Sequence, residues 1–196
     1  MNIGILISGR GSNMVAIVDA VASGEIPDSS VAVVVSDKVS AAGVERARER
    51  GVETVVVERN GRSREDHDAE IIAELKSRGV ELVCLAGYMR FLSPSFVQTF
   101  PDQIINIHPS LLPAFPGLDA QKQAFDAGVK VTGCSVHYVD ELLDHGKVIL
   151  QKEVSILPDD TVETLSHRIL KQENILYVEA VKRVLSLSPT ATNIKA

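Results

Sequence analysis

Short apolar runs alternate with segments of helical periodicity along most of this chain. Residues 3–7 form a continuous apolar run, which is typical of a strand buried on both faces of a parallel sheet. Residues 12–23 follow with apolar side chains at helical spacing, and Gly24 ends that segment. The alternation continues, with strands predicted at residues 31–35, 54–57, 81–86, 104–108, 131–139 and 147–154 and helices at 41–50, 63–78, 121–127 and from 160 onward. This order predicts an α/β fold, a mostly parallel twisted sheet of about seven strands with helices on both faces and an antiparallel pair near the C-terminal end.

Length and charge narrow the class of protein. The 196 residues suit a single domain, which we expect to span residues 1–187 and to be followed by a polar tail at 188–196. A net charge of −6 argues against a general nucleic-acid binder. No apolar stretch approaches the roughly 20 residues of a membrane span and no signal sequence is present, so we expect a cytoplasmic protein that binds no membrane. Cys84 and Cys134 lie in apolar runs without the spacing of a zinc site, which predicts buried free thiols and no metal.

Residues 106–113 place two polar side chains at the end of a predicted strand. Asn106 and His108 are two positions apart and therefore share one face of the strand, while Ile105 and Ile107 point to the other. Pro109 favours an extended backbone at His108. An amide and an imidazole held side by side where strand becomes loop can stabilise negative charge that develops on an oxygen.

The loop at residues 8–13 joins the first predicted strand to the first helix. Its glycines allow a tight turn, and Gly11, Ser12 and Asn13 stand at the helix N-terminus, where hydrogen-bond donors and the helix dipole favour an anion. Neither the third glycine of a dinucleotide fingerprint nor the lysine of a P-loop is present, so a phosphomonoester fits better than NAD or ATP. The alternative is a tight strand–helix turn with Ser12 as its cap.

A carboxylate lies on the apolar stripe of the last predicted helix. Glu173 follows Ile169 by four residues and precedes Leu176 by three, so it faces inward, where an unpartnered charge is costly. It forms a structural salt bridge, stands at the boundary of the buried face, or accepts hydrogen bonds from a ligand.

The turn at residues 140–146 is acidic and follows Ser135 and His137, which share a face of the preceding strand. A carboxylate from this turn that approached His108 would favour the cationic imidazole, and an acid–imidazole–amide set suits acyl transfer. The spacing leaves open whether that carboxylate is Asp140, Glu141 or Asp144.

The remaining histidines, His67, His145 and His167, are expected at the surface. No pair of histidines has metal-ligand spacing. The chain has no Gly-x-Ser-x-Gly motif, which argues against a serine hydrolase.

Together these motifs closely resemble the folate-dependent formyltransferase family, and within it the glycinamide ribonucleotide formyltransferases, over about residues 1–185. The residues that carry the resemblance are 7–13, 85–90, 106–113 with 115–117, 133–139 and Asp144. The motif at residues 106–113 is specific for the family. Within the family, the glycine loop and the short length of the chain favour the glycinamide ribonucleotide formyltransferases. The resemblance implies a Rossmann-like fold, in agreement with the predicted element order.

The resemblance also implies roles for particular residues. Asn106, His108 and Asp144 match the family's catalytic trio, with Ser135 and His137 in support. Gly11, Ser12 and Asn13 match the site for the ribose phosphate of the substrate, and Glu173 matches a residue that contacts the same substrate. The matches to folate-binding elements are Arg64, Met89, Arg90, Phe91, Leu92, Asn106, Asp140, Glu141, Leu142, Leu143 and Asp144. Asp119, Gln121, His145 and Lys147 depart from the pattern of many relatives.

The implied reaction transfers the formyl group of 10-formyltetrahydrofolate, a co-substrate, to the amine of glycinamide ribonucleotide in purine biosynthesis, in a monomer or homodimer. A formyltetrahydrofolate hydrolase shares residues 106–113 but would carry an additional N-terminal regulatory domain. A methionyl-tRNA formyltransferase would need an additional basic C-terminal domain. A third alternative is a non-enzymatic nucleotide sensor that binds phosphate through the glycine loop and leaves His108 structural.

Overall fold

The protein is built on one seven-stranded sheet. The structure, a computed structural model, describes residues 1–187, and the predicted tail at 188–196 lies outside the described residues. The strands are β1 (Asn2–Ile7), β2 (Ser30–Ser36), β3 (Thr54–Val56), β4 (Leu82–Leu85), β5 (Ile104–His108), β6 (Val131–Tyr138) and β7 (Val148–Ser155). Their order is β3-β2-β1-β4-β5-β6-β7, with the first five parallel and β6 and β7 antiparallel to their neighbours. The predicted fold class is confirmed.

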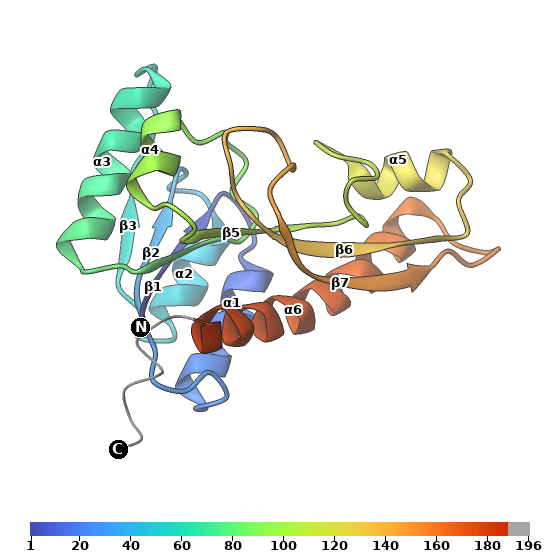
Figure 1. The fold of residues 1–196 in the computed structure, drawn as a ribbon, viewed down its shortest axis with the longest axis horizontal. Coiled ribbons are helices and arrows are strands. Elements are labelled where there is room, and N and C mark those ends of the chain that lie inside the picture. The colour runs from blue at the N-terminus through green and yellow to red at the C-terminus, as the bar shows by residue number, and fades with distance from the viewer. Residues whose placement is uncertain (188–196) are drawn as a thin grey trace.

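Helices cover both faces of the sheet (Figure 1). One face packs against α1 (Ser12–Ala22), α2 (Ala42–Arg48) and α6 (Val162–Leu187), and the other against α3 (Arg64–Ser77) and α4 (Pro94–Thr99). The short α5 (Ala120–Asp126) packs against α6. Each face has its own apolar cluster, so alternate residues of β5 enter different cores: Ile104 faces α3 and α4, whereas Ile105 and Ile107 face α1 and α6.

Two local expectations were wrong. The sequence pattern predicts no helix between β4 and β5, yet α4 begins at Pro94 and is capped by the Ser93 hydroxyl, which accepts from the Phe96 N–H. His67 is buried rather than solvated, with 1% of its surface exposed. At the start of α6, the hydroxyls of Thr161 and Thr164 each accept from the other residue's N–H, which caps the helix reciprocally.

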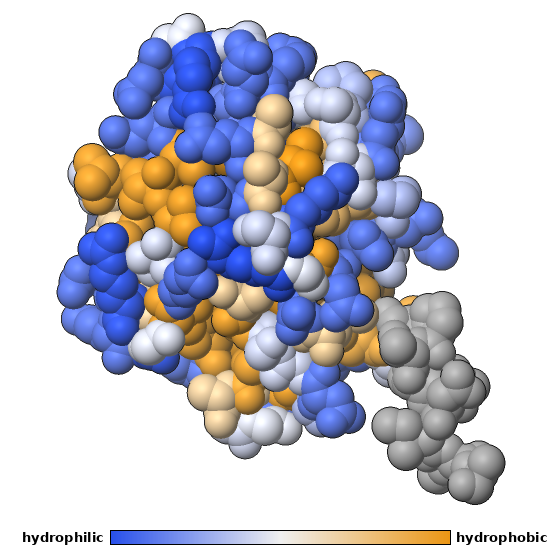
Figure 2. Space-filling view, turned by 90° about the vertical axis from the view of Figure 1, so that its left-hand side faces the viewer, coloured by the Kyte–Doolittle hydropathy of each residue, from blue (hydrophilic) through white to orange (hydrophobic). Residues whose placement is uncertain are grey.

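The two cysteines are buried free thiols, as expected. Burial raises the pKa of Cys84 and of Cys134 to about 12, so both stay protonated at neutral pH. Within residues 1–187, no helix is long and apolar enough to cross a membrane. Seen from the side that carries α3, the surface is hydrophilic over much of its upper part, with apolar residues showing between polar ones lower down (Figure 2).

The strand order reverses between β1 and β4, and loops from both strands meet at that point. The Ser8 N–H donates to the Gly87 carbonyl at 3.0 Å, and the Ser8 hydroxyl accepts from the Met89 N–H at 2.8 Å. In open α/β sheets ligands bind beyond the carboxyl ends of the strands, at such a reversal. The sheet therefore brings the glycine loop, the segment after β4 and the end of β5 to one edge.

Candidate active site

Asn106 and His108 lie side by side on β5, on the face opposite Ile105 and Ile107. The antiparallel neighbour β6 places His137 across from Asn106 and Ser135 across from His108. His108, Ser135 and His137 are buried, and Asn106 is partly exposed. The four polar side chains thus form one patch on the β5–β6 pair.

His137 orients the Asn106 amide. The Nδ1 of His137 lies 2.8 Å from the Tyr138 carbonyl oxygen, which can only accept, so Nδ1 carries the proton. The other ring nitrogen, Nε2, is then an acceptor and receives a hydrogen bond from the Asn106 Nδ2 at 3.2 Å. Burial lowers the pKa of His137 by more than the hydrogen bond to Tyr138 raises it. The net pKa is therefore lowered, and the ring is neutral at pH 7. One hydrogen of the Asn106 amide is therefore fixed on His137 and the second stays available.

One carboxylate of the acidic turn lies near both rings, and that carboxylate is Asp144. Its Oδ2 lies 3.4 Å from the His108 Nδ1, and its Oδ1 lies 3.7 Å from the His137 Nε2. The Gly117 N–H donates to the same Oδ2 at 2.8 Å. The other nitrogen of His108, Nε2, donates to the Phe115 carbonyl at 2.9 Å. Each ring nitrogen of His108 therefore faces an oxygen that can accept a hydrogen bond.

The other two acids of the turn have different partners. Asp140 pairs with the exposed His145 at 3.0 Å and accepts from the Leu142 N–H at 2.9 Å. Partial burial raises the pKa of Asp140, but these two hydrogen bonds outweigh it and the net pKa is lowered. Glu141 accepts from Gln98 on α4 at 3.0 Å. The distances therefore decide among the three candidates in favour of Asp144.

Ser135 ties the loop after β5 to the sheet. Its hydroxyl donates to the Ser110 carbonyl at 2.6 Å and accepts from the Leu112 N–H at 3.0 Å. Gln151 on β7 donates to the same hydroxyl and to the Leu112 carbonyl, both at 2.8 Å. Gln151 was not expected at the site, because nothing in the sequence shows which residue of β7 lies opposite Ser135.

The glycine loop leaves the N-terminus of α1 without a side-chain cap. Gly11 is the N-cap residue in a left-handed conformation (φ +70°), and no side chain accepts from the first turn, so the expected alternative of Ser12 as a cap is wrong. Ser12 is partly exposed and Asn13 is buried. The Asn13 Nδ2 donates to Glu173 at 2.8 Å, which joins the loop to α6.

Glu173 faces inward, where burial disfavours its ionised form. It is 6% exposed, and burial raises its pKa despite the Asn13 hydrogen bond and the nearby positive charge of Arg10. The structural salt bridge considered above is not present among the described residues. The Asn13 Oδ1 is buried without a partner in the same part of the chain. Both groups are suited to hydrogen bonds from a ligand.

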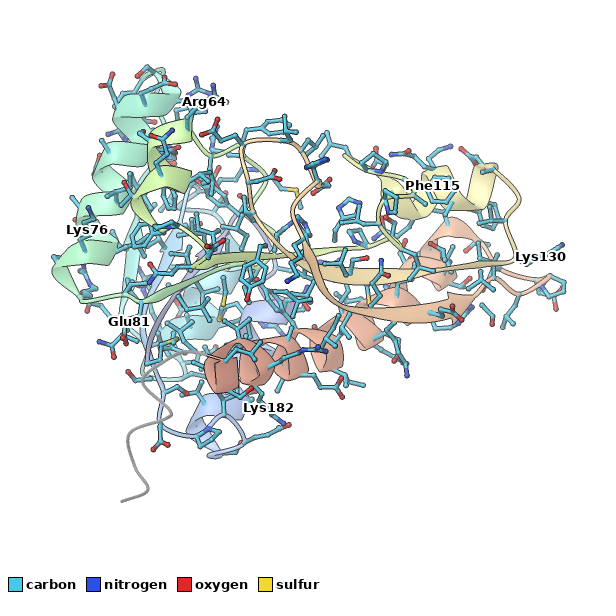
Figure 3. The ribbon with its side chains drawn as sticks, in the orientation of Figure 1. Arg64, Lys76, Glu81, Phe115, Lys130 and Lys182 are labelled. Atoms are coloured by element: carbon cyan, nitrogen blue, oxygen red, sulfur yellow. The ribbon has the colours of Figure 1, made fainter. Side chains whose placement is uncertain are left out.

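Four of the expected folate-binding residues line a common pocket of about 510 Å³, together with residues from the start of α3. The four are Arg64, Met89, Arg90 and Phe91. Asp37, which directly follows β2, forms an ion pair with the Arg90 guanidinium at 2.5 Å. The sequence did not predict this ion pair. Leu92 packs on the α3–α4 core. In Figure 3, Arg64 at the start of α3 and Phe115 in the loop after β5 lie in the upper part of the view, whereas Glu81 lies in the lower part.

A second hollow, of about 350 Å³, lies beside Asp144 between the loop after β5 and the acidic turn. Leu143, His145 and Lys147 line it, and Leu142 is exposed nearby. Asp119 and Gln121 stand at the start of α5, and within residues 1–187 neither side chain bonds to the trio. The described residues contain no group of three or more His, Cys, Asp or Glu side chains placed to hold a metal ion.

Comparison with known proteins supplies the family. The family model described as formyl transferase matches residues 1–181. Phosphoribosylglycinamide formyltransferase of Bacillus subtilis is 44% identical over 185 residues, which cover 94% of this chain and 94% of that protein. The trifunctional purine biosynthetic protein adenosine-3 of Drosophila melanogaster is 44% identical over 186 residues, 94% of this chain. This chain spans only 14% of the length of that trifunctional protein.

Solved structures agree with the sequence comparison. Glycinamide ribonucleotide transformylase 1 from Symbiobacterium toebii has a TM-score of 0.91 and 50% identity, covering 93% of this chain and 86% of that chain. Phosphoribosylglycinamide formyltransferase from Bacillus halodurans has a TM-score of 0.92 and 40% identity, covering 99% of this chain and 98% of that chain. Because the family model and these relatives match nearly its full length, the chain belongs to the formyl transferase family.

Proposed function

We propose that this chain is a phosphoribosylglycinamide formyltransferase, which transfers the formyl group of 10-formyltetrahydrofolate to the primary amine of glycinamide ribonucleotide in purine biosynthesis. The observation that carries the proposal is that Asp144, His108 and Asn106 lie together at the carboxyl ends of the strands, with His108 buried. A neighbouring uncapped helix N-terminus suits the phosphate of the amine substrate.

The reaction begins with attack of the amine nitrogen on the formyl carbon, which forms a C–N bond and leaves negative charge on the formyl oxygen. The available hydrogen of the Asn106 amide donates to that oxygen. The His108 Nε2–H donates to it as well, when the formyl oxygen replaces the Phe115 carbonyl as acceptor. Two donors held in place before the reaction stabilise the charge as it develops.

The intermediate then collapses with breakage of the bond between the formyl carbon and N10 of the folate. The proton lost by the amine passes to Asp144, directly or through water, and the leaving nitrogen takes a proton from His108 or from water that His108 orients. Asp144 also stabilises the cationic form of His108 across the 3.4 Å separation. Protons and charge balance over the two steps.

The substrates occupy neighbouring parts of the edge. In this proposal the amine substrate binds Gly11, Ser12 and Asn13 through its phosphate and Glu173 through its ribose. The folate contacts Asn106 and extends along Arg64, residues 89–92 and residues 140–144. Side-by-side binding supplies much of the rate by orientation.

The wider expectations belong to the same proposal. Residues 1–187 form one catalytic domain that acts in the cytoplasm as a monomer or homodimer, with these two small molecules as its partners and with neither nucleic acid nor membrane.

Consumption of 10-formyltetrahydrofolate by the purified protein, with and without glycinamide ribonucleotide, tests the proposal. We expect turnover only when the amine is present. Turnover without the amine would indicate a hydrolase, and no turnover in either case would indicate a non-catalytic phosphate sensor. Ribosylglycinamide without its phosphate is the matched control, and it should react poorly at the same concentration.

A further inference from the structure

Helix α2 contacts the glycine loop through two residues one helical turn apart, Gly43 and Arg46. The Gly43 N–H donates to the Gly9 carbonyl at 3.0 Å. The Arg46 Nη1 donates to the Arg10 carbonyl at 3.1 Å. Two successive carbonyls of the loop are thus held by a helix that contributes none of the substrate-binding residues described above.

Holding these carbonyls also directs the loop's N–H groups. A peptide unit is planar and trans, so its N–H points away from its C=O. The bond to Gly9 therefore fixes the direction of the Arg10 N–H, and the bond to Arg10 fixes that of the Gly11 N–H. Both N–H groups point away from α2.

These N–H groups belong to a run of free donors. Among the contacts of residues 1–187, the N–H groups from Arg10 to Met14 have no hydrogen-bond acceptor. The left-handed conformation of Gly11, followed by the helical conformation of Ser12, gives the kind of backbone concavity that binds anions. The first turn of α1 contains no acidic side chain that would compete with an anion.

The approach of α2 depends on the absence of a side chain at position 43. A Cβ at Gly43 would lie 2.6 Å from the Ile7 Cδ1, 3.0 Å from the Gly9 oxygen and 3.1 Å from the Gly11 Cα. A Cβ at Gly11 would in turn lie 2.9 Å from the Gly43 Cα. Because the Gly9 oxygen and the Gly11 Cα are backbone atoms, a methyl group at position 43 could be accommodated only by a shift of the loop.

We propose that Gly43 and Arg46 are positioning residues for the substrate phosphate, since α2 sets the directions in which the glycine loop presents its N–H groups. The identity of that phosphate as part of glycinamide ribonucleotide rests on the proposed function. Neither residue needs to touch the ligand. A different role for Arg46, direct attraction of the phosphate by its positive charge, makes different predictions about salt.

The test compares Arg46→Ala with Arg48→Ala, a matched control on the same helix. The Arg48 side chain bonds instead to Thr54 at 3.0 Å and lies 3.6 Å from Glu45. For each protein we would measure kcat, the KM of both substrates, and the Kd of ribose 5-phosphate by calorimetry. The Kd needs no turnover, so it tests the loop even if the wild-type protein transferred no formyl group, a result that would refute only the proposed function.

We expect Arg46→Ala to raise the KM of the phosphorylated amine and the Kd of ribose 5-phosphate by about 5- to 20-fold, because a charge-assisted hydrogen bond that orders the loop is lost. The kcat and the KM of formylfolate should stay within about twofold of wild type, as uniform binding alone is lost. Arg46→Lys, which keeps a donor of similar reach, should recover most of the affinity. Gly43→Ala should weaken the same two constants by at least as much as Arg46→Ala.

Values for Arg46→Ala that match those of Arg48→Ala would overturn the inference. An equal loss of affinity for both substrates would also overturn it, because it would indicate general destabilisation. The difference between wild type and Arg46→Ala should persist in about 0.5 M salt, where the Debye length falls to a few ångströms. If it vanished there, Arg46 would act by its charge and not by positioning the loop.

Discussion

A carboxamide stabilises an oxyanion only when its NH2 group points toward the negatively charged oxygen. In this protein, His137 sets the orientation of the Asn106 amide. The Tyr138 carbonyl fixes the proton on the His137 Nδ1, and the acceptor that remains at Nε2 holds the amide nitrogen. Asp144 completes the arrangement from the next turn of the chain. His137 and Tyr138, which touch no substrate in the proposed mechanism, therefore determine the orientation of Asn106, which does.

Replacement of Asn106 by Ala removes one of the two oxyanion donors. We expect kcat to fall by roughly 100- to 1000-fold while the fold stays intact, as found for lost oxyanion donors in general. Gln103→Ala, which removes an exposed carboxamide just before β5, is the control and should leave kcat unchanged. Near-normal kcat in Asn106→Ala would remove Asn106 from its proposed role.

Replacement of Asp144 by Asn keeps the size of the side chain and removes its charge. The His108 cation loses its stabilising carboxylate, and the amine loses its proton acceptor. We expect a lower kcat with little change in the Kd of ribose 5-phosphate, measured by calorimetry. If only phosphate binding weakened, Asp144 would belong to the substrate pocket instead.

Replacement of Glu173 by Gln should stabilise the free protein and weaken substrate binding. The pKa of Glu173 is raised by burial, so its contribution to stability is largest at low pH and is lost as the pH rises through the folded pKa. We expect the Tm of Glu173→Gln to exceed that of wild type at pH 7 to 8, and the gain to shrink toward pH 4. The KM of the phosphorylated amine should rise. A Tm gain of the same size at every pH would contradict this account.

At the scale of elements, the sequence predicted the type and order of the strands, because period-two and period-3.6 patterns are local properties of the chain. It missed α4, although Ser93 and Pro94 form a usual helix start, because the helix is short. It placed His67 in solvent because charged residues surround it in sequence. In space, His67 bonds to the Val57 carbonyl at 2.8 Å, a contact that no local pattern shows.

The junction between α3 and α4 depends on a buried carboxylate. Asp68 accepts from the Ser93 N–H at 2.5 Å, and both residues are buried. Asp68→Ala would leave that N–H unpaired, which costs about 1–3 kcal/mol. We expect a lower free energy of unfolding by this amount in urea titrations. Glu65→Ala, at an exposed position of the same helix, should change it by less than about 0.5 kcal/mol.

At the scale of the whole molecule, the candidate site joins segments that are far apart in the sequence. Strand periodicity put Asn106 and His108 on one face, and strand order put the glycine loop near them. Spacing could not choose among the three acids of the turn, because the path of a turn depends on packing beyond it. It also gave no sign of Gln151, Asp37, Gly43 or Arg46, whose contacts cross between elements.

A ligand that bridges such segments should stabilise the whole fold. Ribose 5-phosphate at 100 times its Kd should add about 2.7 kcal/mol to the free energy of unfolding. For a protein of this size that corresponds to a rise in Tm of roughly 5–10 °C, measurable by scanning calorimetry. Ribose without phosphate should cause a much smaller rise. Equal shifts with both sugars would argue against a phosphate site in the glycine loop.

The order in which the chain emerges during synthesis has a consequence for the trio. Asn106 and His108 belong to β5, but Asp144 follows a further strand, β6. Glu173 on α6 comes later still. A nascent polypeptide released before residues 140–146 were made would contain His108 without the Asp144 carboxylate. Such truncated products should be chemically inert, even where the parallel half of the sheet has already formed.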